Sequence, residues 1–113
     1  MRMPRNVRKV AESDVNTRDD SGDTALHWAA CEGRCEEVRR LVGRGAEVDI
    51  RNSDGWTAVM VAARYGHEDI VQYLHQAGAD LNIRDNDGWT AVIWAARMGH
   101  EDIVQYLQAA GAK

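Results

Sequence analysis

The chain has 113 residues, which is enough for one domain with a modest core. Its formal net charge of −4 gives no general attraction to nucleic acid or to an anionic membrane, and no apolar run approaches the roughly 20 residues that span a bilayer. The basic N-terminus lacks the apolar segment of a secretory signal, and two cysteines are too few for a disulfide framework. We therefore expect a cytoplasmic or nuclear protein that binds neither nucleic acid nor a membrane.

The first predicted element is a shortened helix. Residues 5–12, RNVRKVAE, resemble a shortened form of a helix that follows in the next unit, with Val7 and Val10 in the places of Val38 and Leu41, and the loop SDVNTRD comes after them. The same order of helix and loop returns further along the chain. Residues 1–18 are therefore predicted to be half of a unit that the rest of the chain repeats.

The remainder of the chain repeats with a period of 33 residues and without insertions. Residues 19–51, 52–84 and 85–113 carry glycines, a threonine and a pair of alanines at the same offsets. The stretch DGWTAVMVAARYGHEDIVQYL, which begins at Asp54, returns as DGWTAVIWAARMGHEDIVQYL with three letters changed. The sequence thus predicts three copies of one structural unit.

The unit at 52–84 shows the predicted elements most clearly. SDGWT is a turn, and Thr57 is a candidate N-cap for the short helix AVMVAAR that follows. Gly66 ends this helix, and the second helix EDIVQYLHQA carries Ile70 and Leu74 on one apolar stripe. Because helices this short cannot bury their apolar sides alone, we expect the units to stack.

These letters resemble those of ankyrin repeats. The resemblance rests on D-x-x-G-x-T in the turn, the A-A pair of the first helix, G-H between the helices and G-A-D-x-N after the second. It implies an all-α solenoid of stacked helix-turn-helix units joined by β-turn loops, in one cooperative domain. The usual proline after the turn threonine is alanine in all three units, and the usual first-helix histidine survives only as His27. We expect both departures to loosen local pre-organisation slightly without threatening the fold.

The sequence shows no pattern for catalysis, a cofactor or a metal. His67 and His100 recur at one position per unit, between the two helices, which favours a structural role. Cys31 and Cys35 lie on either side of Gly33, so two isolated thiols are favoured over a metal site that would need further ligands. We predict that the protein is not an enzyme.

A binding surface follows from the resemblance. In ankyrin repeat proteins the turns and the exposed side of the first helices line a concave face that binds a protein or peptide. All four tryptophans of this chain lie at such positions, and Trp and Arg are enriched at binding hot spots. The residues carried over to this face are Asp20, Asp23, Trp28, Glu32, Asp54, Trp56, Arg64, Tyr65, Asp87, Trp89, Trp94, Arg97 and Met98.

Two alternatives stay open beside a protein-binding scaffold. The chain could be a structural or engineered repeat segment with no partner of its own, and its turn tryptophans would then fill space between neighbouring turns. GWTAVIWAAR also resembles the ankyrin repeats of euchromatic histone lysine methyltransferases, which implies Trp89 and Trp94 as walls of a cage for methylated lysine. Arg97 stands where that family has an acidic cage residue, so we expect no preference for methylated lysine.

Two further expectations concern modification and assembly. YLHQAGADLN resembles the pattern that asparaginyl hydroxylase recognises, with Leu74 eight residues before the possible site Asn82, but an asparagine that bonds to its own loop is favoured over hydroxylation. The last unit repeats the apolar stripe Ile103, Val104 and Leu107 with no unit after it. We expect this stripe to be exposed and to cause weak end-to-end self-association, with fraying of the last helix as the alternative.

Overall fold

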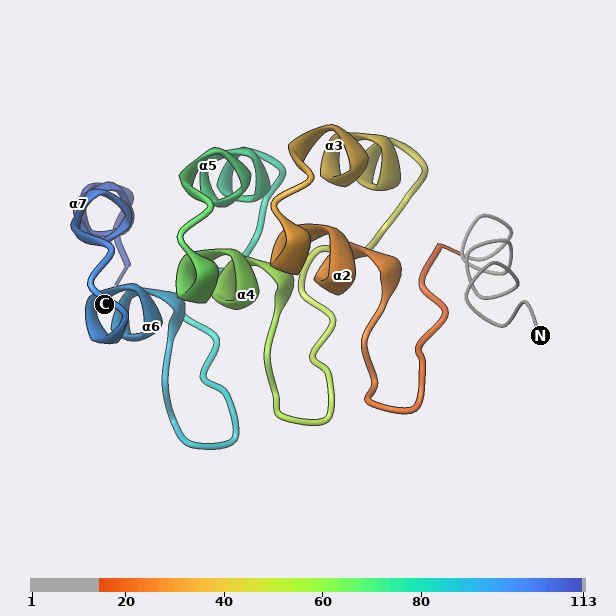
Figure 1. Ribbon diagram of the computed structural model, residues 1–113, viewed down its shortest axis with the longest axis horizontal. Helices are drawn as coiled ribbons and strands as arrows, with labels where there is room; N and C mark the ends of the chain where they lie inside the picture. The colour runs from red at the N-terminus through yellow and green to blue at the C-terminus, as the bar shows by residue number, and fades with distance from the viewer. Residues whose placement is uncertain (1–14, 113) are drawn as a thin grey trace.

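The computed structural model describes residues 15–112, and within them six helices form three pairs (Figure 1). The first helices of the pairs lie in one row, the second helices lie in another, and long loops extend from the first helices away from the second (Figure 1). No strand occurs in the described range. The predicted all-α solenoid is thus confirmed, whereas the predicted half-repeat at 1–18, with Val7 and Val10, lies mostly outside the described residues.

The helices of the three pairs begin at a spacing of 33 residues. The first helices are α2 (Ala25–Glu32), α4 (Ala58–Tyr65) and α6 (Ala91–Arg97), and the second helices are α3 (Cys35–Gly43), α5 (Glu68–Gln76) and α7 (Glu101–Ala109).

Threonine caps begin two of the first helices. The hydroxyls of Thr24 and Thr57 accept the third backbone N–H of α2 and α4, each at 3.4 Å, as predicted for Thr57. Thr90 stands at the same position before α6, but its buried Oγ1 has no hydrogen-bond partner among the described residues. At the other end of α4, Gly66 adopts the left-handed conformation, with φ of 81°.

A buried histidine joins the first unit to the second. The Nδ1 atom of His27 accepts the backbone N–H of Thr24 at 3.0 Å, so the proton resides on Nε2. That Nε2 donates to the backbone carbonyl of Trp56, 2.8 Å away in the next unit. Met60 and Ile93 replace this histidine in the other units and cannot make the bond.

The histidines between the helices join all three units. The Nε2 atom of His67 lies 3.2 Å from the Cys31 carbonyl, and that of His100 lies 3.1 Å from the Arg64 carbonyl, one unit back in each case. These contacts agree with the structural role predicted for the two histidines.

The second helices bury an apolar stripe against the first. In α5 the side chains of Ile70 and Leu74 are fully buried, as the sequence predicted. In α7 Ile103 and Leu107 are also buried, so the expectation that they would be exposed is wrong. They pack against α6 of their own unit, and only Val104, on the outer side of that stripe, is partly exposed.

A matched pair of glycines tests the packing between units. Gly66 and Gly99 have φ values of 81° and 80°, so alanine at either position costs about 1–2 kcal/mol of backbone strain. At Gly66 an added Cβ would also lie 2.7 Å from Cε1 of His100, whereas no described atom lies within 4 Å at Gly99. We expect Gly66→Ala to lower the free energy of unfolding by about 1 kcal/mol more than Gly99→Ala in urea denaturation. Equal losses would contradict tight packing of the His100 ring.

Candidate protein-binding surface

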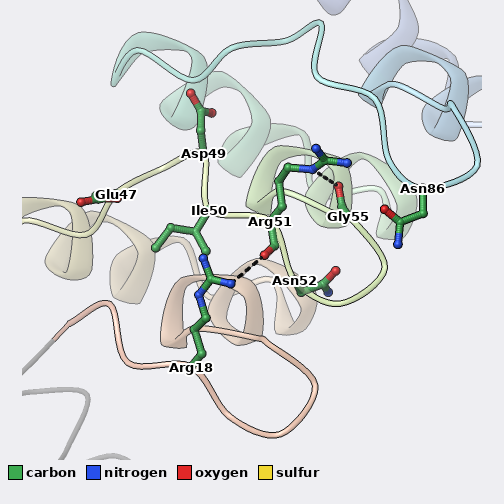
Figure 2. A pocket seen from close by; sticks show the side chains of 8 residues that line it. All are labelled: Arg18, Glu47, Asp49, Ile50, Arg51, Asn52, Gly55 and Asn86. Carbon is green, nitrogen blue, oxygen red and sulfur yellow. Dashed lines mark hydrogen bonds between the residues drawn. The ribbon is translucent and has the colours of Figure 1, made fainter.

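Three arginines at the 33-residue spacing hold the loops beside one another. Nη1 of Arg18 donates to the Arg51 carbonyl at 3.3 Å, and Nη2 of Arg51 donates to the Arg84 carbonyl at 2.9 Å. Arg51 and Arg84 also donate to the carbonyls of Gly55 and Gly88 within their own turns. Figure 2 shows the hollow that these loops enclose, which is lined by Arg18, Glu47, Asp49, Ile50, Arg51, Asn52, Gly55 and Asn86. The donors of Arg18 and Arg51 in this hollow are bonded to backbone carbonyls. We therefore interpret the hollow as a structural feature of the loops and not as a ligand-binding site.

Backbone hydrogen bonds keep the turn tips in register. The Ser53 N–H donates to the Ser21 carbonyl at 3.0 Å, and the Asn86 N–H donates to the Asp54 carbonyl at 3.1 Å. Gly55 leaves room for this contact, because a Cβ there would lie 2.6 Å from Oδ1 of Asn86. The tips therefore present equivalent residues side by side from one unit to the next.

A buried carboxylate, that of Asp85, organises the tryptophans of the second and third units. Its Oδ2 atom accepts the indole N–H of Trp94 at 2.9 Å and that of Trp56 at 3.1 Å. Its Oδ1 atom accepts the backbone N–H groups of Trp89 at 2.8 Å and Asp87 at 2.9 Å. Asp85 is only 5% exposed, so these four donors take the place of water around its charge.

The hydrogen bonds decide the charge state of Asp85. Burial raises the pKa of this carboxyl, but the Trp89 amide, the Trp94 indole, the Asp87 amide and the Trp56 indole all lower it. The net result is a pKa below the ordinary value of 3.8. Asp85 is therefore ionised at neutral pH.

The rings that Asp85 holds also touch one another. The Trp56 and Trp94 rings meet edge to face with centroids 5.6 Å apart, and the Trp89 and Trp94 centroids are 4.6 Å apart. With the neighbouring Tyr65 these three tryptophans form what we call the aromatic cluster. Trp56 comes from the second unit and Trp94 from the third, so the cluster spans the boundary between the units.

Arg64 lies among the rings of the aromatic cluster. The carbon of its guanidinium is 4.8 Å from the Trp56 centroid, 5.0 Å from that of Trp94 and 5.1 Å from that of Tyr65. Its Nε atom is buried and has no hydrogen-bond partner among the described residues.

Arg97 occupies the equivalent position in the third unit, and its guanidinium carbon lies 4.5 Å from the Trp89 centroid. Neither Arg64 nor Arg97 forms an ion pair or a side-chain hydrogen bond within residues 15–112. The sequence predicted both arginines at a binding surface but did not predict that they would stack on its tryptophans.

Three large apolar side chains on this side are exposed. Trp28 is 50% exposed, Tyr65 is 46% exposed and Met98 is 47% exposed, and Tyr65 and Met98 are equivalent residues at the ends of α4 and α6. The indole N–H of Trp28 donates to Asp19, so Trp28 makes its hydrogen bond in the first unit, apart from the aromatic cluster.

The predicted surface residues divide into two groups. Those with exposed side chains are Asp20, Trp28, Glu32, Asp54, Tyr65, Asp87, Arg97 and Met98. Those that are partly buried are Asp23, Trp56, Arg64, Trp89 and Trp94. Asp23 accepts a hydrogen bond from the Asn52 side chain at 2.8 Å, and Glu32 lies 3.6 Å from Arg34.

Sequence reasoning missed the two aspartates that hold tryptophans. Asp19 accepts the Trp28 indole N–H at 3.0 Å, as Asp85 does that of Trp94 nine residues further on. In the second unit the same two positions hold an asparagine and a valine, Asn52 and Val61. The joint change from aspartate with tryptophan to asparagine with valine was visible within the chain and could have indicated the contact.

The two cysteines are free thiols on successive helices. Burial, followed by the charges of Glu32 and Asp23, raises the pKa of the Cys31 thiol above its ordinary value of 9.0. This thiol is therefore protonated at neutral pH, which disfavours oxidation through the thiolate. Within residues 15–112 no group of three His, Cys, Asp or Glu side chains is arranged to hold a metal ion, and no helix there is long and apolar enough to cross a membrane.

Residues 32–113 match the family model for ankyrin repeats (3 copies), so the chain belongs to the ankyrin repeat family. One similar protein is the G patch domain and ankyrin repeat-containing protein 1 homolog of Drosophila melanogaster, which is 55% identical over 40 residues. Another is Scaffold protein ILK of Homo sapiens, which is 49% identical over 37 residues. These matches cover 35% and 33% of this chain but only 12% and 8% of the two relatives. Ankyrin repeats generally mediate protein–protein interaction and are generally non-catalytic.

The importance of Asp85 can be tested with Asp85→Asn. An asparagine can still accept the two backbone N–H groups, as Asn52 does in the second unit, but its amide nitrogen would face two indole donors. We expect a loss of about 1.5–3 kcal/mol in the free energy of unfolding at pH 7. Because folding lowers the pKa of Asp85, the stabilisation is present above the ordinary value of 3.8 and is lost as the pH falls through the folded-state value.

The control for this substitution is Asp54→Asn, at an exposed turn tip. Urea denaturation between pH 7 and pH 3 should show little effect of Asp54→Asn, and a gap between wild type and Asp85→Asn that narrows below about pH 4. A gap that stays constant across this range would mean that the charge of Asp85 is not the source of its effect.

Proposed function

We propose that this chain is a non-catalytic interaction scaffold that binds a protein or a peptide through the turns and the first helices. The observation that supports the proposal best is the exposure of Trp28, Tyr65 and Met98 on the first-helix side. Exposed aromatic and methionine side chains are costly in water, and these residue types are enriched where proteins bind one another.

The rigidity of this side supports the proposal as well. Asp19 holds Trp28 and Asp85 holds Trp56 and Trp94, so the large rings are fixed before a partner arrives. A surface that is already ordered loses less side-chain entropy on binding. Membership of the ankyrin repeat family fits such a role.

The two alternatives have less support. A methyl-lysine cage built on Trp89 and Trp94 would have to admit a cation where Arg97 and Arg64 already lie within 5.0 Å of those rings. Like charges would oppose that ligand. A repeat segment without a partner would leave the exposure of Trp28 and Tyr65 without a function.

Hydroxylation of Asn82 stays a prediction. Asn82 is exposed, whereas Leu74 is fully buried in α5, so an enzyme that needs both would have to bind a locally opened chain. Treatment with asparaginyl hydroxylase decides between hydroxylation and a purely structural loop asparagine, because hydroxylation raises the mass of the Asn82 peptide by one oxygen atom. An unmodified peptide would contradict the prediction.

End-to-end self-association also stays a prediction. The outer side of the third unit exposes less apolar surface than the sequence indicated, because Ile103 and Leu107 are buried and mainly Val104 and Ile93 remain partly open. We therefore expect any association through this end to be weak. A cytoplasmic or nuclear location stays a prediction too.

The scaffold proposal predicts which face retains a partner. Immobilised wild-type protein, the double variant Trp28→Ala/Tyr65→Ala and the control Arg39→Ala/Gln105→Ala should be compared in affinity capture with quantitative mass spectrometry. The control residues are exposed on the second helices α3 and α7. Proteins retained by both wild type and control should fall at least tenfold with the double variant, which corresponds to about 1.4 kcal/mol. Retention by all three proteins alike, with helical content unchanged, would contradict the proposed face.

A further inference from the structure

One feature of the surface that the scaffold function does not yet explain is a pair of arginines without acidic partners in the part of the chain that the structure describes. Arg64 and Arg97 are 33 residues apart, in the last turns of α4 and α6, and so occupy equivalent places in neighbouring units. The chain carries 18 acidic residues against 14 arginines and lysines, yet neither guanidinium pairs with a carboxylate within the described range.

Several other arginines of the chain donate hydrogen bonds within the molecule. Arg51 and Arg84 donate to loop carbonyls, and Arg40 forms a 2.7 Å ion pair with Glu37. By contrast, Nε of Arg64 is buried and has no hydrogen-bond partner within residues 15–112. A buried donor left without a hydrogen bond is uncommon in native structures, because the lost solvation is not replaced. Because this Nε is buried, the donors of Arg64 that a partner could reach are its Nη groups, which donate no hydrogen bond within residues 15–112 either.

The rings fix these guanidinium groups in place while leaving their hydrogen-bonding capacity unused. Arg64 lies within 5.1 Å of three ring centroids, and Arg97 lies 4.5 Å from that of Trp89. An aromatic ring interacts with a guanidinium without consuming its N–H donors, which lie in the guanidinium plane. A guanidinium held in this way is pre-organised to bind a carboxylate with two parallel hydrogen bonds.

We propose that Arg64 and Arg97 bind two carboxylates of an extended acidic segment in the partner protein. The proposal rests on the scaffold function and specifies the chemistry of its partner. Neighbouring units stack at roughly helix-packing distance, about 8–10 Å, and an extended chain advances about 3.3 Å per residue. Two Asp or Glu residues about three positions apart therefore match the two arginines, and Tyr65 and Met98, next to them in sequence, offer apolar contact to the residues between.

Charge around the site limits which partner fits. Asp54 and Asp87 at the turn tips and Glu32 at the end of α2 are exposed carboxylates of the same predicted face. A uniformly acidic partner would be repelled by these groups, whereas a short acidic segment centred on the ends of α4 and α6 would not. A cationic segment would be repelled by the guanidinium groups, which already lie over the aromatic rings.

The test uses a phage-displayed library of random linear 12-residue peptides, selected on the full chain. We expect the selected peptides to share two acidic residues about three positions apart. Synthetic versions should lose at least tenfold in affinity, about 1.4 kcal/mol, with Arg97→Gln, measured by fluorescence anisotropy. When each acidic residue of the peptide is replaced by its amide in turn, replacement of the one that binds Arg97 should cost as much as Arg97→Gln and should add little to that loss, because both changes remove the same interaction. Replacement of the other acidic residue, which binds Arg64, should add to the loss in Arg97→Gln.

The matched control is Arg39→Gln. Arg39 is exposed on α3 with its guanidinium carbon 4.9 Å from the Tyr73 centroid, so it is a ring-stacked arginine on a different face. This variant should bind the peptides within twofold of wild type. Arg97 is the decisive position because it contacts one ring, whereas Arg64→Gln also removes contacts within the aromatic cluster; thermal unfolding of each variant establishes that it is folded.

Neutral or basic consensus peptides, acidic peptides that bind Arg97→Gln as well as wild type, or the absence of any selected peptide would each overturn this inference. Peptides that depend on Trp28 and Tyr65 but not on the arginines would overturn it while leaving the scaffold function standing. The scaffold function itself fails only if whole proteins do not depend on that face.

Discussion

The carboxylate of Asp85 is the interaction on which the surface of this protein depends. It is buried, it is ionised, and four N–H donors from two units converge on its two oxygens. Two of the donors are indoles, so the orientation of Trp56 and Trp94 is fixed by an electrostatic contact as well as by packing. Arg64 then lies among rings whose positions are already determined. Without this carboxylate, no hydrogen bond would fix the orientation of the Trp56 and Trp94 rings near which Arg64 lies.

The repeat supplies the setting for this contact. Stacking at a fixed spacing places equivalent residues side by side, so a bond made once can be made again one unit later. The Arg51-to-Arg84 loop contact repeats that of Arg18 with Arg51, and the His100 contact repeats that of His67. The arginine contacts join neighbouring loops, and the histidine contacts join neighbouring helix pairs. Within the duplicated stretch that begins at Asp54 and again at Asp87, the two units differ only at positions 60, 61 and 65 against 93, 94 and 98, which lie in or next to the first helices.

Much of the fold could be predicted because its causes are local. The Thr57 cap, the left-handed Gly66 and the buried stripe of Ile70 and Leu74 each depend on residues within one unit. The missing hydrogen bond of Thr90 and the burial of Ile103 could not be predicted from the same residues. Both depend on how neighbouring helices pack against each other.

The sequence predicted which residues belong to the candidate surface, but it did not predict the contacts between their side chains. The sequence indicated that Trp56, Arg64 and Trp94 would share a face, since they belong to corresponding turns and first helices. That a guanidinium would lie among the rings, and that Asp85 would accept two indoles, requires the distances between side chains of different units. Only the paired change of Asp and Trp to Asn and Val in the second unit carried any trace of this in the sequence.

An acid titration of the indole N–H signals by ¹H–¹⁵N NMR tests the central role of Asp85 most directly. The chain has four tryptophans, and two of them, Trp56 and Trp94, share this one carboxylate. Their indole signals should therefore shift together, with a single midpoint below the ordinary pKa of 3.8, while that of Trp89 does not follow. Separate midpoints for Trp56 and Trp94, or a shared midpoint at or above 3.8 while the spectrum remains that of a folded protein, would contradict this role.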